Sequence, residues 1–261
     1  MRRSLSASID DLVRANHILA NEGVLDAYGH VSIRHPLHQD RFLISVSRSP
    51  ELVEREDIEA YAFDGTPVAP SARSPYLERF IHGGIYSARP DVQAIVHSHA
   101  DDVIPFSITD VPLRPVLHLA SDVGPKVPVW DMADRFGDTT NLVTDFAQGR
   151  DLAAALADAR AVLMRGHGFT VAGRSLFEAV RLAIYLPRNA RVLMDALRMS
   201  PTVRAFSEGE IRVRERMDPD GAPARRAWEY WCAKLESRNC GCGRHRESPG
   251  DDGPSGASPM P

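Results

Sequence analysis

The chain has 261 residues, of which 43% are hydrophobic and 25% are charged, values typical of a globular protein with a sizeable core. Its net charge of −4 gives no basic excess, so we expect no nucleic-acid partner, and no apolar run is long enough to span a membrane. The basic N-terminus lacks the apolar stretch of a secretory signal, and the three cysteines all fall late in the chain. These features predict a reducing, cytoplasmic location.

The first part of the chain alternates apolar patterns of helical and strand type. Apolar residues at helical spacing predict helices over about residues 9–22 and 77–87. Short runs rich in β-branched and aromatic residues predict strands at residues 31–33, 41–45, 60–63 and 92–97. The pair Asp64-Gly65 after the third of these strands is a hairpin turn signal.

The second part of the chain is mainly helical in pattern. We expect helices over residues 103–108, 151–158 and 176–199, with a short buried strand at 161–164. Pro187 lies inside the longest of these helices, so we expect a kink there. Helices that alternate with strands predict a layered α/β fold around a mainly antiparallel or mixed sheet.

The C-terminal part divides into two pieces. Residues 221–238 carry Trp228, Tyr230 and Trp231, and form either a packing helix or a flap over a neighbouring site. Residues 239–261 are rich in Gly, Ser and Pro, which predicts a disordered tail. We therefore expect a single domain over residues 1–238.

Three histidines carry the clearest chemical signal. His97 and His99 end an apolar strand, and side chains two residues apart on a strand share a face. His167 lies in a distant turn between two glycines. Three imidazoles on one side of a divalent metal leave positions open for water or substrate. The alternative is that these are ordinary polar residues at strand ends.

The chain resembles the class II aldolase/adducin family from about residue 12 to residue 197. The resemblance lies in four stretches, Tyr28-Gly29-His30-Val31-Ser32-Ile33-Arg34, the group Glu78, His82, Tyr86 and Arg89-Pro90-Asp91, the run Ile95-Val96-His97-Ser98-His99-Ala100, and Arg165-Gly166-His167-Gly168. It implies a three-layer fold with a sheet between helices. It also implies one divalent metal ion per chain on His97, His99 and His167, with Glu78 as acid/base or extra ligand. Adducin-like members lack this metal set.

The positions that hold a phosphate in the sugar-phosphate members differ here. His30 replaces an asparagine, Ser45-Val46-Ser47-Arg48 replaces a Thr-Gly segment, and Tyr76-Leu77 replaces a Ser-Ser pair. The tight anion cradle of backbone and hydroxyl groups is therefore largely absent, which argues against a phosphorylated sugar.

The residues found in its place suit a planar carboxylic acid. Arginine binds carboxylates in a bidentate fork, and tyrosine offers a flat wall for an aromatic ring. We expect the substrate to be bound by His30, Ser32, Arg48, Arg73 and Tyr76. For the two arginines, the alternative is a solvated surface position.

Two further residues are expected to act across a subunit boundary. His118 lies about where the family places a tyrosine that reaches a neighbouring subunit's site, and could donate a proton to the product carbon. Tyr230 could act in the same way. The resemblance implies a homotetramer with sites at the subunit interfaces. The group Cys240, Cys242 and His245 lacks a fourth ligand, so we do not expect a second metal site there.

These features together predict a metal-dependent carbon–carbon lyase using Zn, Mn, Fe or Co. The favoured activity is decarboxylation of a hydroxylated aromatic or heteroaromatic carboxylic acid, and the small-molecule carboxylate is the expected partner. Three alternatives remain: a retro-aldol lyase on a small hydroxy-carbonyl substrate, an Fe(II)-dependent oxygenase on the same three histidines, and an adducin-like interaction protein.

Overall fold

A computed structural model describes residues 4–241, with side chains over residues 4–237. Its seven strands are β1 (His30–Arg34), β2 (Arg41–Ser45), β3 (Ile58–Ala62), β4 (Ala94–Ser98), β5 (Val129–Trp130), β6 (Ala161–Met164) and β7 (Gly168–Gly173). They form one sheet in the order β3-β2-β1-β4-β7-β6-β5. Every neighbouring pair is antiparallel except β5 and β6, which are parallel. The predicted mainly antiparallel, mixed sheet is confirmed.

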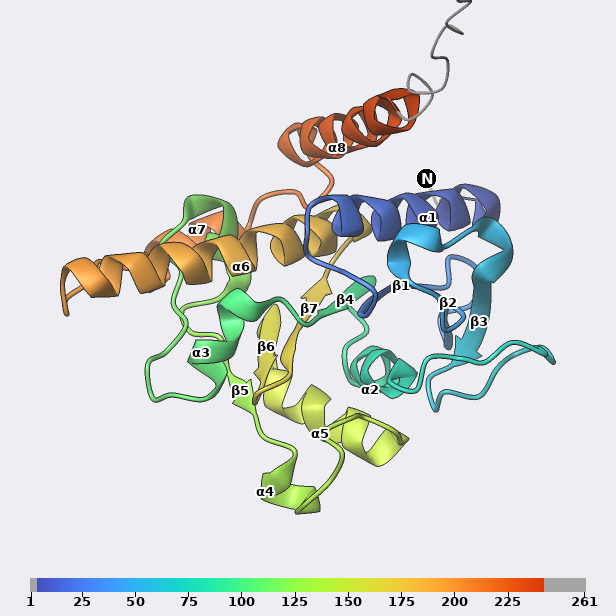
Figure 1. Cartoon of the computed structure of the whole chain (residues 1–261), viewed down its shortest axis with the longest axis horizontal. Coiled ribbons are helices and arrows are strands. Elements are labelled where there is room, and N and C mark those ends of the chain that lie inside the picture. Colours follow the sequence, from blue (N-terminus) through green and yellow to red (C-terminus); the bar gives the residue numbers. More distant parts are fainter. Residues whose placement is uncertain (1–3, 242–261) are drawn as a thin grey trace, which may run out of the picture.

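Helices cover both faces of this sheet. The α-helices are α1 (Leu5–Asn21), α2 (Arg79–Ala88), α3 (Ile104–Ser107), α4 (Ala133–Phe136), α5 (Phe146–Leu156), α6 (Leu176–Met199), α7 (Glu208–Glu215) and α8 (Ala222–Gly241). Short 3-10 segments lie at η1 (Pro50–Leu52), η2 (Arg55–Asp57), η3 (Asp101–Val103) and η4 (His118–Val123). Figure 1 shows α1 and α6 on one side of the sheet, and α2 and α5 on the other.

Two hydrophobic cores follow from the alternation of side chains along the strands. In β4, Ala94 and Val96 belong to the core packed against α1 and α6. Ile95 belongs to the second core, packed against α2 and α5. The sheet is therefore buried between two helical layers, which confirms the predicted three-layer α/β fold.

The sequence patterns located most elements but missed several short ones. β7 was not predicted, because the glycines around His167 indicated only a turn and hid the start of a strand. The two-residue β5 and the short helices α4 and α7 carry little periodic signal. Pro187 does not end α6, which runs continuously from Leu176 to Met199.

The C-terminal helix extends further along the chain than predicted. Residues 221–238 were expected as a helix or a flap, and α8 extends to Gly241. The first three residues of the predicted tail, 239–241, therefore belong to a helix, and the remainder, including Cys242 and His245, lies outside the described residues. Within residues 4–241, no helix is both long enough and apolar enough to cross a bilayer.

Candidate metal centre

Side chains of the candidate site come from elements that the fold places side by side. Glu78 precedes α2, and His82 and Tyr86 follow at intervals of four residues, so all three lie on one helical face. His30 on β1 lies opposite His97 on β4 in antiparallel register. Both histidines point toward the α2 side, because their neighbours along each strand pack against α1 and α6.

Three imidazoles and one carboxylate converge between these elements. His97 Nε2 lies 3.1 Å from His99 Nε2, which lies 3.0 Å from His167 Nε2. Glu78 Oε2 lies 3.5 Å from His97 Nε2 and 3.6 Å from His167 Nε2. The ligand atoms of these four residues all lie within 4.8 Å of one another. We call the four residues the histidine centre.

The imidazoles are held in a form suited to metal binding. His97 Nδ1 lies 3.1 Å from the carbonyl oxygen of Phe169, so an Nδ1–H donates there and leaves the Nε2 lone pair facing the centre. Burial lowers the pKa of His97, and burial together with the neighbouring His97 and His167 lowers the pKa of His99 to about 4. Both imidazoles are therefore neutral near pH 7.

A tight turn places His167 opposite the two strand histidines. Gly166 has a φ of +62°, a left-handed conformation that favours glycine. A Cβ at Gly168 would lie 2.1 Å from the carbonyl oxygen of Ser98, so a larger residue cannot approach the end of β4 as closely. The two flanking glycines thus bring β7 against β4 and direct His167 into the centre.

The Glu78 carboxylate is fixed through one oxygen. Its Oε1 accepts a 3.0 Å hydrogen bond from the Val143 backbone N–H, so Oε2 is turned toward the histidines. Burial alone would raise the pKa of Glu78, but the adjacent imidazoles of His167 and His97 outweigh it and hold the pKa well below its ordinary value. The side chain is therefore an ionised carboxylate, able to accept a proton or to bind a cation.

The histidine centre fits a divalent ion. Neutral imidazole nitrogens and a carboxylate oxygen are ligands that Zn, Mn, Fe and Co accept. Nitrogen atoms about 2.1 Å from one ion lie roughly 3 Å apart, which agrees with the 3.0 and 3.1 Å separations. A cation among these lone pairs would also relieve their mutual repulsion. The structure therefore brings together the three histidines and the glutamate that the sequence pattern had singled out.

A pocket of about 380 Å³ opens beside this centre. Glu78 and His99 form its inner end, and its other walls include His30, Arg48 and Tyr76. The His30 and Tyr76 rings lie 4.7 Å apart, and the Tyr76 hydroxyl donates a hydrogen bond to the Arg48 carbonyl oxygen. Three of the residues predicted to bind substrate thus line one pocket next to the metal ligands.

The two predicted substrate arginines have different surroundings. Both pair with the buried Asp57, at 3.4 Å from Arg48 Nε and 3.0 Å from Arg73 Nη1. Arg48 also lines the pocket, whereas Arg73 pairs with Glu59 and is not among the pocket-lining residues. In this chain Arg73 is a partner of two carboxylates rather than a free substrate ligand, because the loop that carries it folds back on β3.

Ser32 lies beneath His30 rather than in the pocket. It is completely buried, and its hydroxyl bonds to His82 and Tyr86 instead of facing the cavity. The sequence reasoning gave no role to His82 or Tyr86. The signal was their spacing of four and eight residues from Glu78, which places all three on the helical face toward the sheet.

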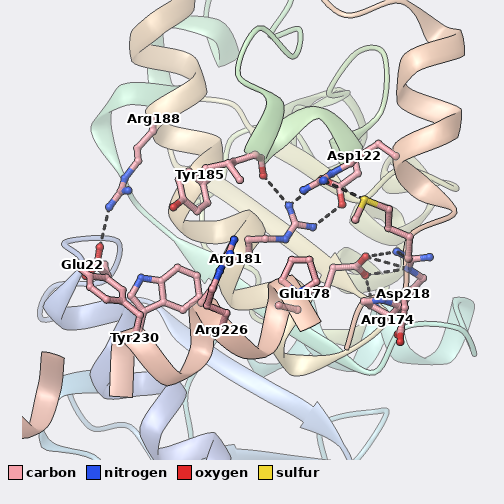
Figure 2. Close-up of a pocket in the computed structure, with 18 of the residues that line it drawn as sticks. Glu22, Asp122, Arg174, Glu178, Arg181, Tyr185, Arg188, Asp218, Arg226 and Tyr230 are labelled. Atoms are coloured by element: carbon pink, nitrogen blue, oxygen red, sulfur yellow. Dashed lines mark hydrogen bonds and ion pairs between the residues drawn. The ribbon is translucent and has the colours of Figure 1, made fainter. Parts of the chain in front are cut away.

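His118 and Tyr230 lie away from the pocket in the single chain. His118 is exposed at the start of η4, and neither residue lines the pocket beside the histidine centre. Tyr230 instead lines a separate cavity of about 650 Å³ between α6 and α8 (Figure 2). A role for either residue across a subunit boundary stays a prediction, because the structure holds one chain.

This second cavity, which we call the arginine cavity, contains charges that are largely paired. Figure 2 shows Arg181 bound to Asp122, Arg174 to Glu178 and Arg188 to Glu22, three ion pairs between residues that line the cavity. The Arg181–Asp122 pair is shielded, with side chains 13% and 7% exposed.

Comparison with known proteins places the chain among lyases. It is 34% identical over 259 residues to decarboxylase tropJ of Talaromyces stipitatus, covering 91% of this chain and 97% of that relative. It is 25% identical over 239 residues to the 3,4-dihydroxyphthalate decarboxylase of Arthrobacter keyseri, covering 85% and 92%. It is 29% identical over 209 residues to the L-fuculose phosphate aldolase of an Escherichia coli strain, covering 78% and 89%.

Solved structures show that the same fold occurs in other proteins. An aldolase II superfamily protein from Pseudomonas syringae superposes with a TM-score of 0.75 at 22% identity, covering 91% of this chain and 96% of that one. The model of the Class II Aldolase and Adducin N-terminal domain matches residues 10–194. The histidine centre lies inside this matched range, and the chain belongs to the class II aldolase and adducin family as a carbon–carbon lyase.

Proposed function

We propose that the chain is a decarboxylase of a hydroxylated aromatic or heteroaromatic carboxylic acid. The observation that carries this proposal is the pocket wall formed by His30, Arg48 and Tyr76 beside the histidine centre. These side chains suit a flat, anionic substrate better than a sugar phosphate. The similarity to decarboxylase tropJ and to a 3,4-dihydroxyphthalate decarboxylase supports the same activity.

We further propose one divalent ion per chain, which is Zn, Mn, Fe or Co. When bound, such an ion supplies a Lewis acid that polarises the hydroxyl oxygen next to the substrate carboxylate. His97, His99 and His167 would hold it through Nε2.

Glu78 is the group that moves the proton. Its ionised Oε2 can accept the proton of the substrate hydroxyl, while Val143 holds Oε1 in place. The bond between the ring carbon and the carboxylate then breaks, its electron pair stays on the ring, and carbon dioxide leaves. Protonated Glu78 returns the proton to that ring carbon, so the substrate is converted to its decarboxylated phenolate.

Pocket residues orient the substrate for this step. Tyr76 offers its ring as a wall beside His30, and Arg48 lines the same pocket. Asp57 already pairs with Arg48, so a substrate carboxylate would compete with or join that pair. Because the Arg48 side chain is 40% exposed, such a contact would add less binding free energy than the same contact with a desolvated arginine.

The test is product analysis with a panel of ortho-hydroxy aromatic carboxylates and a panel of sugar phosphates. We expect carbon dioxide release from at least one aromatic acid, without oxygen uptake, in the metal-loaded protein. Efficient cleavage of sugar phosphates with no turnover of any aromatic acid would replace this proposal by the retro-aldol alternative. Strict dependence on dioxygen would replace it by the oxygenase alternative.

We also propose a homotetramer in which His118 and Tyr230 complete a neighbouring subunit's site. The motive is their exposure in the single chain, Tyr230 being 62% exposed. Light scattering should give four times the chain mass. A fully active monomer would exclude this assembly.

A further inference from the structure

A continuous chain of hydrogen bonds connects the substrate pocket to the protein core. His30 Nδ1 lies 2.6 Å from His82 Nε2, and His82 Nδ1 lies 2.6 Å from Ser32 Oγ. Ser32 Oγ in turn lies 2.9 Å from the Tyr86 hydroxyl oxygen. All four side chains are buried, with at most 3% of each residue exposed. None of the four residues of the histidine centre takes part in this hydrogen-bond network. The proposed mechanism gives no role to its three inner members, His82, Ser32 and Tyr86.

The hydroxyl of Tyr86 determines which group donates in each bond of this hydrogen-bond network. Burial raises the pKa of Tyr86, so the phenol keeps its proton. Within residues 4–241, Ser32 Oγ is its one hydrogen-bond partner. The phenol must therefore donate to Ser32, because an undonated buried hydroxyl costs about 1–3 kcal/mol. Ser32 then has one hydrogen left to donate, and His82 Nδ1 is the remaining neighbour.

The direction passes through His82 to the pocket. Burial lowers the pKa of His82 to about 3, so its imidazole is neutral and carries a single N–H. Since Nδ1 accepts from Ser32, the proton is on Nε2 and is donated to His30 Nδ1. Because His30 Nδ1 accepts this hydrogen bond, the ring proton of His30 is on Nε2, and His30 is one of the residues that line the pocket.

We propose that Tyr86, Ser32 and His82 are positioning residues that hold His30 as a hydrogen-bond donor toward an anionic substrate oxygen. Resting on the proposed function, this names the feature that the pocket recognises: a carboxylate oxygen of the aromatic acid, bound by the His30 Nε2–H. In this tautomer His30 cannot accept a proton from substrate, which leaves Glu78 as the proton acceptor. The Ser32 hydroxyl, which accepts from Tyr86 and donates to His82, thus makes the pocket specific for an oxygen that accepts hydrogen bonds.

The first test reads the tautomer directly. The full chain, loaded with zinc and labelled with ¹⁵N-histidine, is examined by NMR, and the His30 signals are assigned by their loss in His30→Gln. We expect a protonated Nε2 and an unprotonated Nδ1 in the free protein. A protonated Nδ1 on His30 would overturn the proposal. This measurement uses no substrate, so it stands whether or not the chain proves to be a decarboxylase.

The second test separates positioning from a purely structural role. Ser32→Ala removes the donor to His82 Nδ1 and should convert the His30 signal to a mixture of both tautomers. The binding of phthalate, an aromatic dicarboxylate without the hydroxyl group that the proposed reaction requires, should weaken by up to roughly tenfold, the effect of one lost hydrogen bond. Metal content should not change. Ser87→Ala is the matched control, because Ser87 is an exposed residue of α2 whose hydroxyl donates to the Gly84 carbonyl oxygen.

An unchanged His30 tautomer in Ser32→Ala would show that Ser32 does not set it. If Ser32→Ala does not fold, the wild-type tautomer still decides the direction of the chain. Weakened probe binding together with an unchanged tautomer would indicate a structural effect of the serine and would also overturn the proposal.

Discussion

The histidine centre and the arginine cavity show how differently one chain arranges its polar side chains. In the histidine centre, the nitrogen and oxygen atoms of three imidazoles and a carboxylate face one another at 3.0–3.6 Å. In the arginine cavity, each of three carboxylates has an arginine partner. The cavity is the larger of the two spaces, at about 650 Å³ against 380 Å³ for the pocket beside the centre.

The comparison teaches that unmet bonding capacity is a better guide to a site than volume. Lone pairs held together by strands and a glycine turn need a cation that the protein does not provide. Charges that satisfy one another need no further ligand. Substitutions in each region, followed by separate measurements of metal content, activity and stability, test this difference.

Removal of a histidine ligand should have the largest effect. His99→Ala should lose the divalent ion and all activity, because a three-histidine site loses much of its affinity with one ligand. Elemental analysis of the purified protein measures the content, expected near one ion per chain in the wild type. His38→Ala, which changes an exposed histidine, is the control. Full occupancy in a His97/His99 double alanine variant would refute a metal site here.

Glu78→Gln should leave the metal in place and lower kcat by about 10²–10⁴-fold. The amide keeps an oxygen that can accept from the Val143 N–H, but it cannot take up the substrate proton. Steady-state kinetics with the best aromatic acid measures the change, and elemental analysis verifies the ion. A kcat within a few-fold of the wild type would remove Glu78 from the proton transfer.

Arg181→Met should destabilise the fold without touching the histidine centre. It leaves the carboxylate of Asp122 shielded and unpaired, which costs about 3–5 kcal/mol. Urea unfolding measures the loss, and the metal content should equal that of the wild type. The double variant Asp122→Asn/Arg181→Met should recover part of the stability. A loss of metal in Arg181→Met would show that the two regions are coupled.

Acid should destabilise the region around the histidine centre. The pKa of His82 is about 3 in the folded chain and near 6.5 when unfolded, so the unfolded state binds more protons between these values. The free energy of unfolding should therefore fall as the pH drops from about 6.5 toward 3, by up to about 1.4 kcal/mol per pH unit from this group. Urea titrations of metal-free protein should show a shallower pH slope for His82→Gln. Equal slopes would contradict the buried, neutral histidine.

Substitution of Arg48 and Arg73, the two arginines predicted to bind substrate, should have the smallest effects. The change in KM should differ between the two variants. Arg48→Ala should raise KM about tenfold, because the side chain lines the pocket but is 40% exposed and already paired. Arg73→Ala should leave KM unchanged, since its partners are Asp57 and Glu59. Kinetics of both variants on one substrate measures the difference. Equal increases in KM would mean that Arg73 also reaches the substrate.

Local periodicity determined much of this protein from the sequence alone. The period of two along a strand put His97 and His99 on one side, and the glycines around His167 indicated the turn that completes the set. The spacing of apolar residues located the long helices and five of the seven strands found in residues 4–241. These features depend on neighbours within a few residues, and the sequence contains those neighbours explicitly.

Only the tertiary structure decided which polar groups are free. Arg73 and Arg48 both pair with Asp57, and Ser32 is bonded to His82 and Tyr86 of α2, contacts between residues 9 to 54 positions apart. The same contacts orient His30 through His82. A hydrogen bond or ion pair forms wherever packing brings two groups together, and packing depends on the whole chain, so no local pattern encodes it.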